Sequence, residues 1–267
     1  STMDPEGRID IELFGGTANL GRVVRRGETV RRPVRANSEG VHALLRHLEE
    51  VGFDGAPRFL GIDERGREVL SYIPGEPVTP PFPAWALTDE ALRSVARLLR
   101  RYHEAAAEFD TRPHVWPMAP PRPFTGHLAC HNDPNLANVI FRDGQAVALI
   151  DFDLASPAQP VWDVAAAVRL LAPLRSEEYI EDARRGDAVR RMQVFLAASG
   201  PAGISPERLI DAVIAHQQWL YGVVAGGATT GNPGFLEYWR RGLPRVVATR
   251  EWCRANRGRL IAAAALG

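Results

Sequence analysis

Two short polar stretches near the middle of the chain contain the side chains best suited to chemistry. The first is His131-Asn132-Asp133-Pro134-Asn135-Leu136-Ala137-Asn138, and the second is Asp151-Phe152-Asp153. A carboxylate such as Asp133 can orient and deprotonate an attacking hydroxyl. The amide oxygen of Asn138 and the carboxylate of Asp151 are hard ligands of the kind that Mg²⁺ prefers, and the metal can in turn bind nucleotide phosphates. These residue types predict phosphoryl transfer.

A predicted β-hairpin connects the two polar stretches. Apolar runs flank Asp143-Gly144, a dipeptide that favours the positive-φ turn whose twist matches paired strands. With the turn at these two residues, Asn138 lies opposite Leu149 and about 7 Å of strand from Asp151. Asp133 precedes Asn138 on the incoming loop, so its carboxylate can reach the same volume. The hairpin therefore predicts one shared site for a divalent cation and a hydroxyl group.

The spacing Asp-x-x-x-x-Asn, with a histidine two residues before the aspartate, is that of the kinase catalytic loop. Here the chain resembles the aminoglycoside phosphotransferase and choline kinase superfamily, whose members share the protein-kinase-like fold. The resemblance is specific from His131 to Asp163 and looser elsewhere. It implies Asp133 as the catalytic residue, Asn138, Asp151 and Asp153 as magnesium ligands, and His131 and Asp163 as structural support of the site.

A glycine-containing loop near the N-terminus is the expected cover of the nucleotide. Leu13 to Gly21 reads as a loop between two strands, and glycines let backbone amides approach phosphate oxygens. Three glycines are weak evidence alone, but the resemblance assigns this segment to the nucleotide, with Gly16 and Thr17 in contact with it.

The next predicted strand, Thr29 to Pro33, is where kinases carry their phosphate-binding lysine. All 32 basic residues of this chain are arginines, so Arg31 or Arg32 must replace that lysine. Strand alternation puts Val30 and Arg32 on one face, which favours Arg32. The resemblance to relatives that end this strand in an aliphatic-Arg pair favours Arg31 instead.

A helix from Val41 to Glu50 is predicted by apolar residues at helical spacing. It corresponds to the kinase helix whose glutamate pairs with the lysine. The aligned position is occupied by Val41 or His42, so Glu39 or Glu49 must substitute, or the ion pair is missing.

A change in composition after Ile73 marks a lobe boundary. Two strands are predicted over Pro57–Ile62 and Glu68–Ile73, and a proline-rich run follows the second and continues to Pro83. We expect a nucleotide-binding lobe over 1–73 and a catalytic and acceptor-binding lobe over 74–267. By position, the backbone of Ser71 and Ile73 would pair with the adenine edge. The fold class is α+β, with two lobes, a small β-rich N-lobe and a larger, mostly helical C-lobe that holds the catalytic hairpin.

The C-terminal third is expected to form helices that shape the acceptor pocket. Helical patterns cover residues near 187–198, 205–224 and 234–264, after a long helix over 88–109 with Thr88 as its N-cap. The stretch from Pro233 to the end contains seven arginines and two glutamates, which does not suit a polycationic aminoglycoside. An acidic cluster at 177–182 could offset this charge, although most charged runs are solvated.

The composition excludes several classes of partner. The chain has 267 residues with equal numbers of basic and acidic side chains, so neither nucleic acid nor an anionic membrane is expected to bind. Two cysteines do not make a disulfide framework, and no apolar run reaches about 18 residues, so we expect a cytoplasmic protein. The sequence does not predict an oligomeric state.

The activity that the sequence predicts is Mg²⁺-dependent transfer of the γ-phosphate of ATP or GTP to a hydroxyl of a small, antibiotic-like acceptor. The segment from Asp151 to Trp162 is too short for the activation segment of a protein kinase. Two alternatives remain: a metabolite kinase for an alcohol, amino alcohol or sugar, and a catalytically weak nucleotide-binding relative, suggested by the missing lysine and glutamate.

Overall fold

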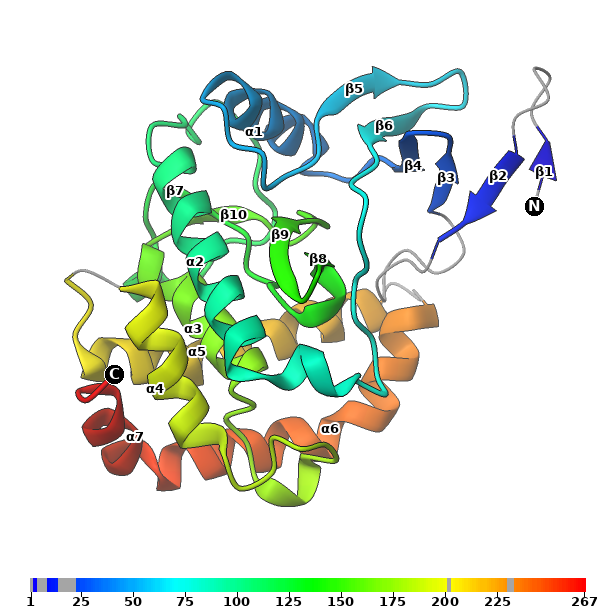
Figure 1. Ribbon diagram of the computed structural model, residues 1–267. Helices are drawn as coiled ribbons and strands as arrows, with labels where there is room; N and C mark the ends of the chain where they lie inside the picture. Colours follow the sequence, from blue (N-terminus) through cyan, green and yellow to red (C-terminus); the bar gives the residue numbers. More distant parts are fainter. Residues whose placement is uncertain (1, 4–8, 14–22, 201–202, 230–232) are drawn as a thin grey trace.

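The computed structural model describes residues 2–3, 9–13, 23–200, 203–229 and 233–267. A small lobe rich in strands is followed in the chain by a larger lobe that is mostly helical (Figure 1). This is the α+β arrangement that the sequence predicts. Gly16 and Thr17, expected in the nucleotide-covering loop, lie outside the described ranges.

The N-terminal lobe is built on one antiparallel sheet. Its order is β1-β2-β3-β4-β6-β5, which places β4 beside β6. The strands are β1 Thr2–Met3, β2 Ile9–Glu12, β3 Val24–Arg26, β4 Thr29–Pro33, β5 Phe59–Ile62 and β6 Arg67–Ser71. Helix α1, Ser38–Glu50, lies against this sheet and buries its apolar stripe, as predicted. In the β4–β6 register Arg32 lies opposite Glu68.

An extended connection runs from the end of β6 down the side of the catalytic hairpin to the short 3-10 helix η2, Ala84–Leu87 (Figure 1). The Glu76 amide donates to the Phe141 carbonyl, and the Phe141 amide donates back to Glu76, each at 2.9 Å. Further along, the Val78 amide donates to the Leu136 carbonyl at 3.0 Å. The connection is therefore bound to the hairpin as an added strand edge.

The predicted hairpin consists of β8, Val139–Arg142, and β9, Gln145–Leu149. Asp143 and Gly144 have φ values of 51° and 73°, as the Asp-Gly turn predicts. The predicted register is wrong beyond the turn, because a bulge shifts the pairing by one residue and Val139 faces Leu149. The Ile150 amide consequently donates to the Asn138 carbonyl, which brings Asn138 one residue closer to Asp151 than predicted.

Strands β7, Leu128–Cys130, and β10, Ser156–Ala158, pair antiparallel and hold the loops on either side of this hairpin. The 3-10 helix η4, Leu136–Asn138, leads into β8.

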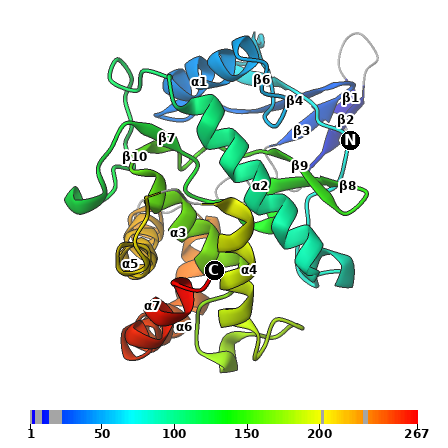
Figure 2. The ribbon, with the colours of Figure 1, turned by 60° about the vertical axis from the view of Figure 1, so that its left-hand side comes forward.

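Helices form the rest of the larger lobe, and Figure 2 shows α2 crossing between the sheet and the C-terminal helices. Thr88 caps α2, as predicted, by accepting from the Ala91 amide. The predicted helical segment 234–264 is two helices, because the chain breaks at Asn256. None of the helices in the described ranges is long and apolar enough to span a membrane. The helices are α2 Asp89–Ala106, α3 Pro160–Leu171, α4 Ala188–Ser199, α5 Pro206–Thr229, α6 Pro233–Ala255 and α7 Arg257–Ala264, with short 3-10 turns η3 Arg122–Phe124 and η5 Glu177–Tyr179.

One cluster of buried apolar side chains extends through both lobes. It runs from Leu44 and Leu48 of α1 through Tyr102 of α2 to Val168 of α3. The Tyr102 hydroxyl donates to the Ala129 carbonyl at 2.5 Å, so a buried polar group is satisfied at the base of the catalytic loop. The lobes therefore share a core that fixes the position of the loop between them.

Candidate active site

The two polar loops meet because β7 and β10 pair beside the hairpin. Asn132 and Asp151 have φ values of 69° and 61°, in a region that non-glycine residues seldom occupy. The Asn132 side chain holds the loops together, since its Nδ2 donates to the Leu154 carbonyl and to Ser156 Oγ, both at 2.8 Å. Strained backbone supported by such bonds is typical of functional sites.

The Asp133 carboxylate is half-buried and held by two amide side chains. Asn135 Nδ2 donates to one of its oxygens at 2.8 Å, and Asn138 Nδ2 donates to the other at 3.1 Å. Burial raises the pKa of Asp133 to about 7, and the charge of Asp151 adds to the rise, while the bond from Asn135 opposes it. A carboxylate with this pKa can accept a proton near neutral pH.

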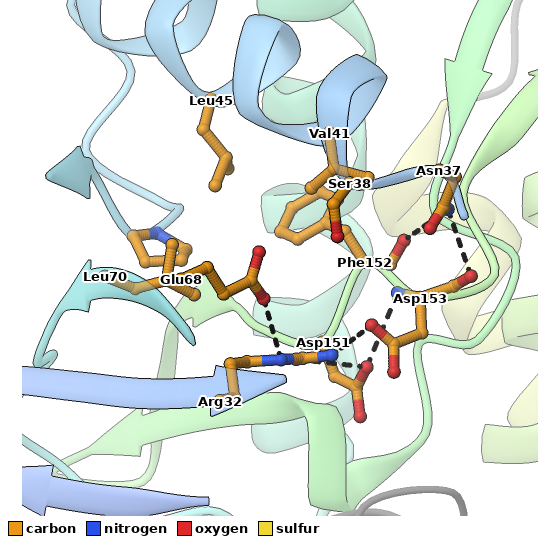
Figure 3. Close-up of a pocket in the computed structure, with 11 residues that line it drawn as sticks. Arg32, Asn37, Ser38, Val41, Leu45, Glu68, Leu70, Asp151, Phe152 and Asp153 are labelled. Carbon is orange, nitrogen blue, oxygen red and sulfur yellow. Dashed lines mark hydrogen bonds and ion pairs between the residues drawn. The ribbon is translucent and has the colours of Figure 1, made fainter. Parts of the chain in front are cut away.

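The predicted metal ligands offer only oxygen atoms, which suits Mg²⁺. Asn138 uses its Nδ2 toward Asp133, which leaves its carboxamide oxygen for a cation. Asp151 and Asp153 lie side by side, and Asp153 donates its amide to the Asp151 carboxylate at 3.4 Å. Arg32 contacts both carboxylates (Figure 3). The bond from the Ile150 amide to the Asn138 carbonyl brings Asn138 beside Asp151 at one end of the hairpin. Among the described residues no three His, Cys, Asp or Glu side chains are grouped to hold a metal ion, so a bound cation would also need Asn138 and phosphate oxygens.

Asp163, at the start of α3, is fully buried beneath the catalytic loop. It accepts from the backbone amides of His131 and Asn132 at 3.0 and 2.8 Å, and from His103 Nε2 at 2.9 Å. Burial alone would raise the pKa of Asp163, but the hydrogen bond and charge of His103 hold it below 3.8. His103 of α2 therefore holds this carboxylate in place.

His131 joins the two loops through both ring nitrogens. Its Nε2 lies 2.9 Å from the Ile150 carbonyl, and its Nδ1 accepts from the Asp133 amide at 3.3 Å. Burial lowers the pKa of His131, which favours the neutral ring with the proton on Nε2. The ring of Phe152 packs against it, so the histidine braces the site.

Arg31 and Arg32 point to opposite faces of β4. The Arg31 Nε lies 3.3 Å from the Asp63 carboxylate, away from the metal ligands. Arg32 is buried, and its NH1 lies 3.4 Å from the Asp151 carboxylate. Burial would lower the pKa of Arg32, but the charges of Asp151, Asp153 and Glu68 raise it, so the guanidinium stays ionised. The structure places Arg32, as strand alternation favoured, at the site.

The expected substitutes for the helix glutamate lie elsewhere. Glu39 is exposed, and Glu49 pairs with Arg58 at 3.4 Å. The carboxylate beside Arg32 is Glu68 of β6, whose oxygen lies 2.9 Å from the Arg32 Nε. Sequence reasoning missed Glu68, and the signal that could have found it is its opposite charge directly across the β4–β6 register.

The backbone candidates for adenine lie where they were expected along the chain. Ser71 ends β6, and Ile73 follows in the connection that runs past the hairpin. Both are half-buried. Their pairing with a base is predicted from their position along the chain.

Comparison with known proteins identifies the family. A model of the phosphotransferase enzyme family matches residues 125–197, the segment that contains the catalytic hairpin. The trifolitoxin immunity protein of Rhizobium leguminosarum bv. trifolii is 36% identical over 202 residues, which cover 72% of this chain and 73% of that protein. The chain belongs to the phosphotransferase enzyme family.

Solved structures confirm the kinase-like fold of this phosphotransferase. A choline/ethanolamine kinase family protein from Mesorhizobium loti superposes with a TM-score of 0.62 at 18% identity, over 97% of this chain and 93% of the other. A mutant aminoglycoside 2'-phosphotransferase-IIIa in its GDP complex superposes with a TM-score of 0.60 at 13% identity, over 94% and 93%. The predicted enzyme class, a phosphotransferase acting on hydroxyl groups of small molecules, is confirmed by the family.

A buried cation lies between α3 and α5 in the larger lobe. Arg169 of α3 is 8% exposed, and its NH1 donates to Gln217 Oε1 of α5 at 2.9 Å. Its charge also lowers the pKa of Asp133, against the larger effect of burial. The acidic cluster does not counter it, because Glu177 and Glu178 are exposed and Asp182 pairs with Arg184.

Proposed function

We propose that this phosphotransferase moves the γ-phosphate of ATP or GTP to a hydroxyl of a small, antibiotic-like acceptor in a Mg²⁺-dependent reaction. The observation that carries the proposal is the convergence of Asp133, Asn138 and Asp151 at one end of the hairpin, beside the cation of Arg32. Residues 1–73 would then bind the nucleotide, and residues 74–267 would supply the catalytic groups and the acceptor pocket.

Each side chain has a distinct part in this reaction. Asp133 would receive the proton of the acceptor hydroxyl and orient its oxygen for attack. Asn138 and Asp151, with Asp153, would hold Mg²⁺, which offsets the negative charge of the phosphates when bound. Arg32 would contact the phosphates from the sheet side. His131 and Asp163 would keep the loop in place by the bonds described above.

The nucleotide proposal is supported by the fold relative whose structure contains GDP. Gly16 and Thr17 would lie over the phosphates, and the backbone at Ser71 and Ile73 would meet the base. The proposed contacts with the base are backbone groups, so a comparison of ATP and GTP binding tests which nucleotide is preferred.

The antibiotic-like acceptor is supported by the relative named as an immunity protein against trifolitoxin, since phosphorylation of a toxic compound is one chemical route to immunity. The buried Arg169 favours a neutral or anionic acceptor over a polycation. The second candidate, a metabolite kinase for an alcohol, amino alcohol or sugar, is supported by the likeness to the choline/ethanolamine kinase family protein.

The test is a turnover screen. The purified chain is incubated with Mg²⁺ and ATP or GTP, and with two panels: hydroxylated antibiotics, both cationic and uncharged, and small alcohols, amino alcohols and sugars. Transfer is followed by ³¹P NMR, with Asp133→Asn as the control. Phosphorylation within the antibiotic panel is expected. Products from the second panel alone would favour the metabolite kinase, and no binding of either nucleotide would contradict the proposal.

A further inference from the structure

Three carboxylates from two segments surround the Arg32 guanidinium. Glu68 comes from β6, and Asp151 and Asp153 come from the loop after the hairpin (Figure 3). The inner nitrogen, Nε, lies 2.9 Å from Glu68, while the outer NH1 and NH2 face Asp151 and Asp153. Arg32 is only 6% exposed, so its direction is set by these neighbours rather than by solvent.

Glu68 is itself held from a second direction. One of its oxygens meets Arg32, and the other lies 2.6 Å from His42 Nε2 of α1. Both Glu68 and His42 are buried, and the His42 ring stacks on Phe59 of β5 with 3.8 Å between ring centroids. Both carboxylate oxygens of Glu68 have a partner, and the His42 ring is fixed by its packing on Phe59. Glu68 therefore has little freedom to move away from Arg32.

This arrangement differs from the one that the family resemblance implies, in which a glutamate on the helix faces the strand cation. Here the helix supplies His42, and the strand next to the cation supplies the carboxylate. The inner side of the guanidinium is thereby occupied, and its outer edge is directed at the metal ligands. A planar guanidinium presented edge-on can bind two phosphate oxygens at once, which a lysine cannot do.

We propose that Glu68, held by His42, is the positioning residue that directs Arg32 to the nucleotide phosphates, so that a strand carboxylate does the work of the helix glutamate. The inference rests on the proposed function. It also explains how the chain can lack both the lysine and the helix glutamate while retaining an ion pair at this position.

The test measures nucleotide affinity. The full chain is titrated calorimetrically with a non-hydrolysable ATP or GTP analogue in the presence of Mg²⁺, and melting temperatures without nucleotide are recorded for each variant. Glu68→Gln removes the charge that orients Arg32. The matched control is Asp63→Asn, which neutralises another buried carboxylate of the same lobe, the partner of Arg31 and Arg67 away from the site.

Glu68→Gln is expected to weaken binding about tenfold or more, because breaking one side of a buried ion pair leaves the direction of the Arg32 guanidinium unset. Asp63→Asn is expected to leave affinity within about twofold. If Glu68→Gln does not fold, Glu68→Asp, which keeps the charge but shortens its reach by one methylene, is measured with the same expected direction.

An exchange variant tests whether Glu68 acts by positioning Arg32 or only by stabilising the folded chain. The double substitution His42→Glu with Glu68→His moves the carboxylate to the helix and keeps both side chains. Recovery of most of the lost affinity is expected. A folded Glu68 variant that binds like the wild type, an equal loss in Asp63→Asn, or a folded exchange variant without recovery would overturn the inference. A wild-type chain that binds neither analogue would instead overturn the proposed function on which it rests.

Discussion

The carboxyl group of Asp133 shows how much of this site is decided by immediate neighbours. Two amide side chains donate to its oxygens, and burial raises its pKa to about 7. The same side chain on an exposed loop would be an ordinary surface carboxylate. Its fitness as a proton acceptor therefore comes from burial, which raises its pKa, while Asn135 and Asn138 fix the direction of its oxygens and oppose the rise.

Asp133→Asn should lower the rate of phosphoryl transfer by about 10²–10⁴, the usual contribution of a general base. Nucleotide affinity should change little, because the proposed role of Asp133 is toward the acceptor hydroxyl and not toward the phosphates. The rate is measured under saturating nucleotide with the acceptor found by screening. A variant with near wild-type turnover would show that Asp133 is not the proton acceptor.

Arg32→Ala and Arg31→Ala should have different effects. Arg32→Ala removes the cation beside Asp151 and should weaken Mg²⁺-nucleotide binding about tenfold or more. Arg31→Ala removes the contacts with Asp63 and with Thr29 Oγ1, which lie away from the site, and should leave affinity within about twofold. Calorimetric titration of both variants checks this, and the reverse order of effects would assign the phosphates to Arg31.

Asp163→Asn should lower the free energy of unfolding by about 1–3 kcal/mol, because a buried acceptor of amide bonds is replaced by a group with one oxygen and a donor. Urea denaturation measures the change. Asp54→Asn is the control, because this exposed residue pairs only with Arg101 at the surface and should cost at most about 0.5 kcal/mol.

The carboxylate of Asp163 should also change how the free energy of unfolding depends on pH in acid. The pKa of Asp163 in the folded chain lies below its ordinary 3.8, so the unfolded chain binds more protons as the pH falls through this range. The contribution of the Asp163 carboxylate to the free energy of unfolding is therefore complete above the pKa that the group has in the unfolded chain. This contribution is lost as the pH falls from there through the lower pKa of the folded chain. The difference in stability between wild type and Asp163→Asn should shrink below about pH 4. A constant difference would contradict the assignment.

At the scale of the elements, the connection from β6 to η2 lies against the hairpin of β8 and β9. It pairs with β8 through Glu76 and Phe141, and Gly75 permits the approach. Gly75 has a φ of 137°, and a Cβ there would lie 2.5 Å from the Phe141 carbonyl oxygen. A side chain at this position would push the connection away from the hairpin.

Gly75→Ala should therefore destabilise the protein by about 2 kcal/mol or more, through backbone strain and loss of the paired amides. Gly222→Ala is the matched control, since Gly222 lies within α5 and a Cβ there would meet nothing within 4 Å. That change should be neutral or stabilise by up to about 1 kcal/mol. Chemical denaturation compares the two, and equal stabilities would contradict the close packing of the connection.

At the scale of the whole molecule, side chains and backbone from both lobes meet at the proposed metal site. Asn37 Nδ2, just before α1, donates to the Asp153 carbonyl at 3.1 Å. The Leu149 amide at the end of β9 donates to the Gly55 carbonyl at 2.8 Å. Because these hydrogen bonds join the two lobes, a ligand bound at the proposed metal site should stabilise the two lobes as one unit.

Mg²⁺ with the preferred nucleotide should raise the melting temperature of the whole chain in a single transition. At a concentration of 100 times the dissociation constant, binding adds about 2.7 kcal/mol, which corresponds to about 5 °C or more for a chain of this size. Nucleotide with excess EDTA is the control and should give a smaller shift. Two separate transitions, or no shift with Mg²⁺, would contradict a shared site.

The sequence by itself determined the parts of this protein that depend on local spacing. The Asp-Gly turn, the Asp-x-x-x-x-Asn loop and the cap at Thr88 follow from backbone preferences of neighbouring residues, which act before any tertiary contact forms. Periodicity along the chain also predicts several of the helices and strands, while the two-lobed fold class was implied by the family resemblance of the motif.

Only the tertiary structure decided which distant side chains meet. The bulge in the hairpin moved Asn138 by one position, and the β4–β6 register brought Glu68 to Arg32. His103 reached Asp163 because α2 and α3 pack side by side under the loop. Spacing along a chain does not encode such contacts, since they depend on the packing of segments far apart in sequence.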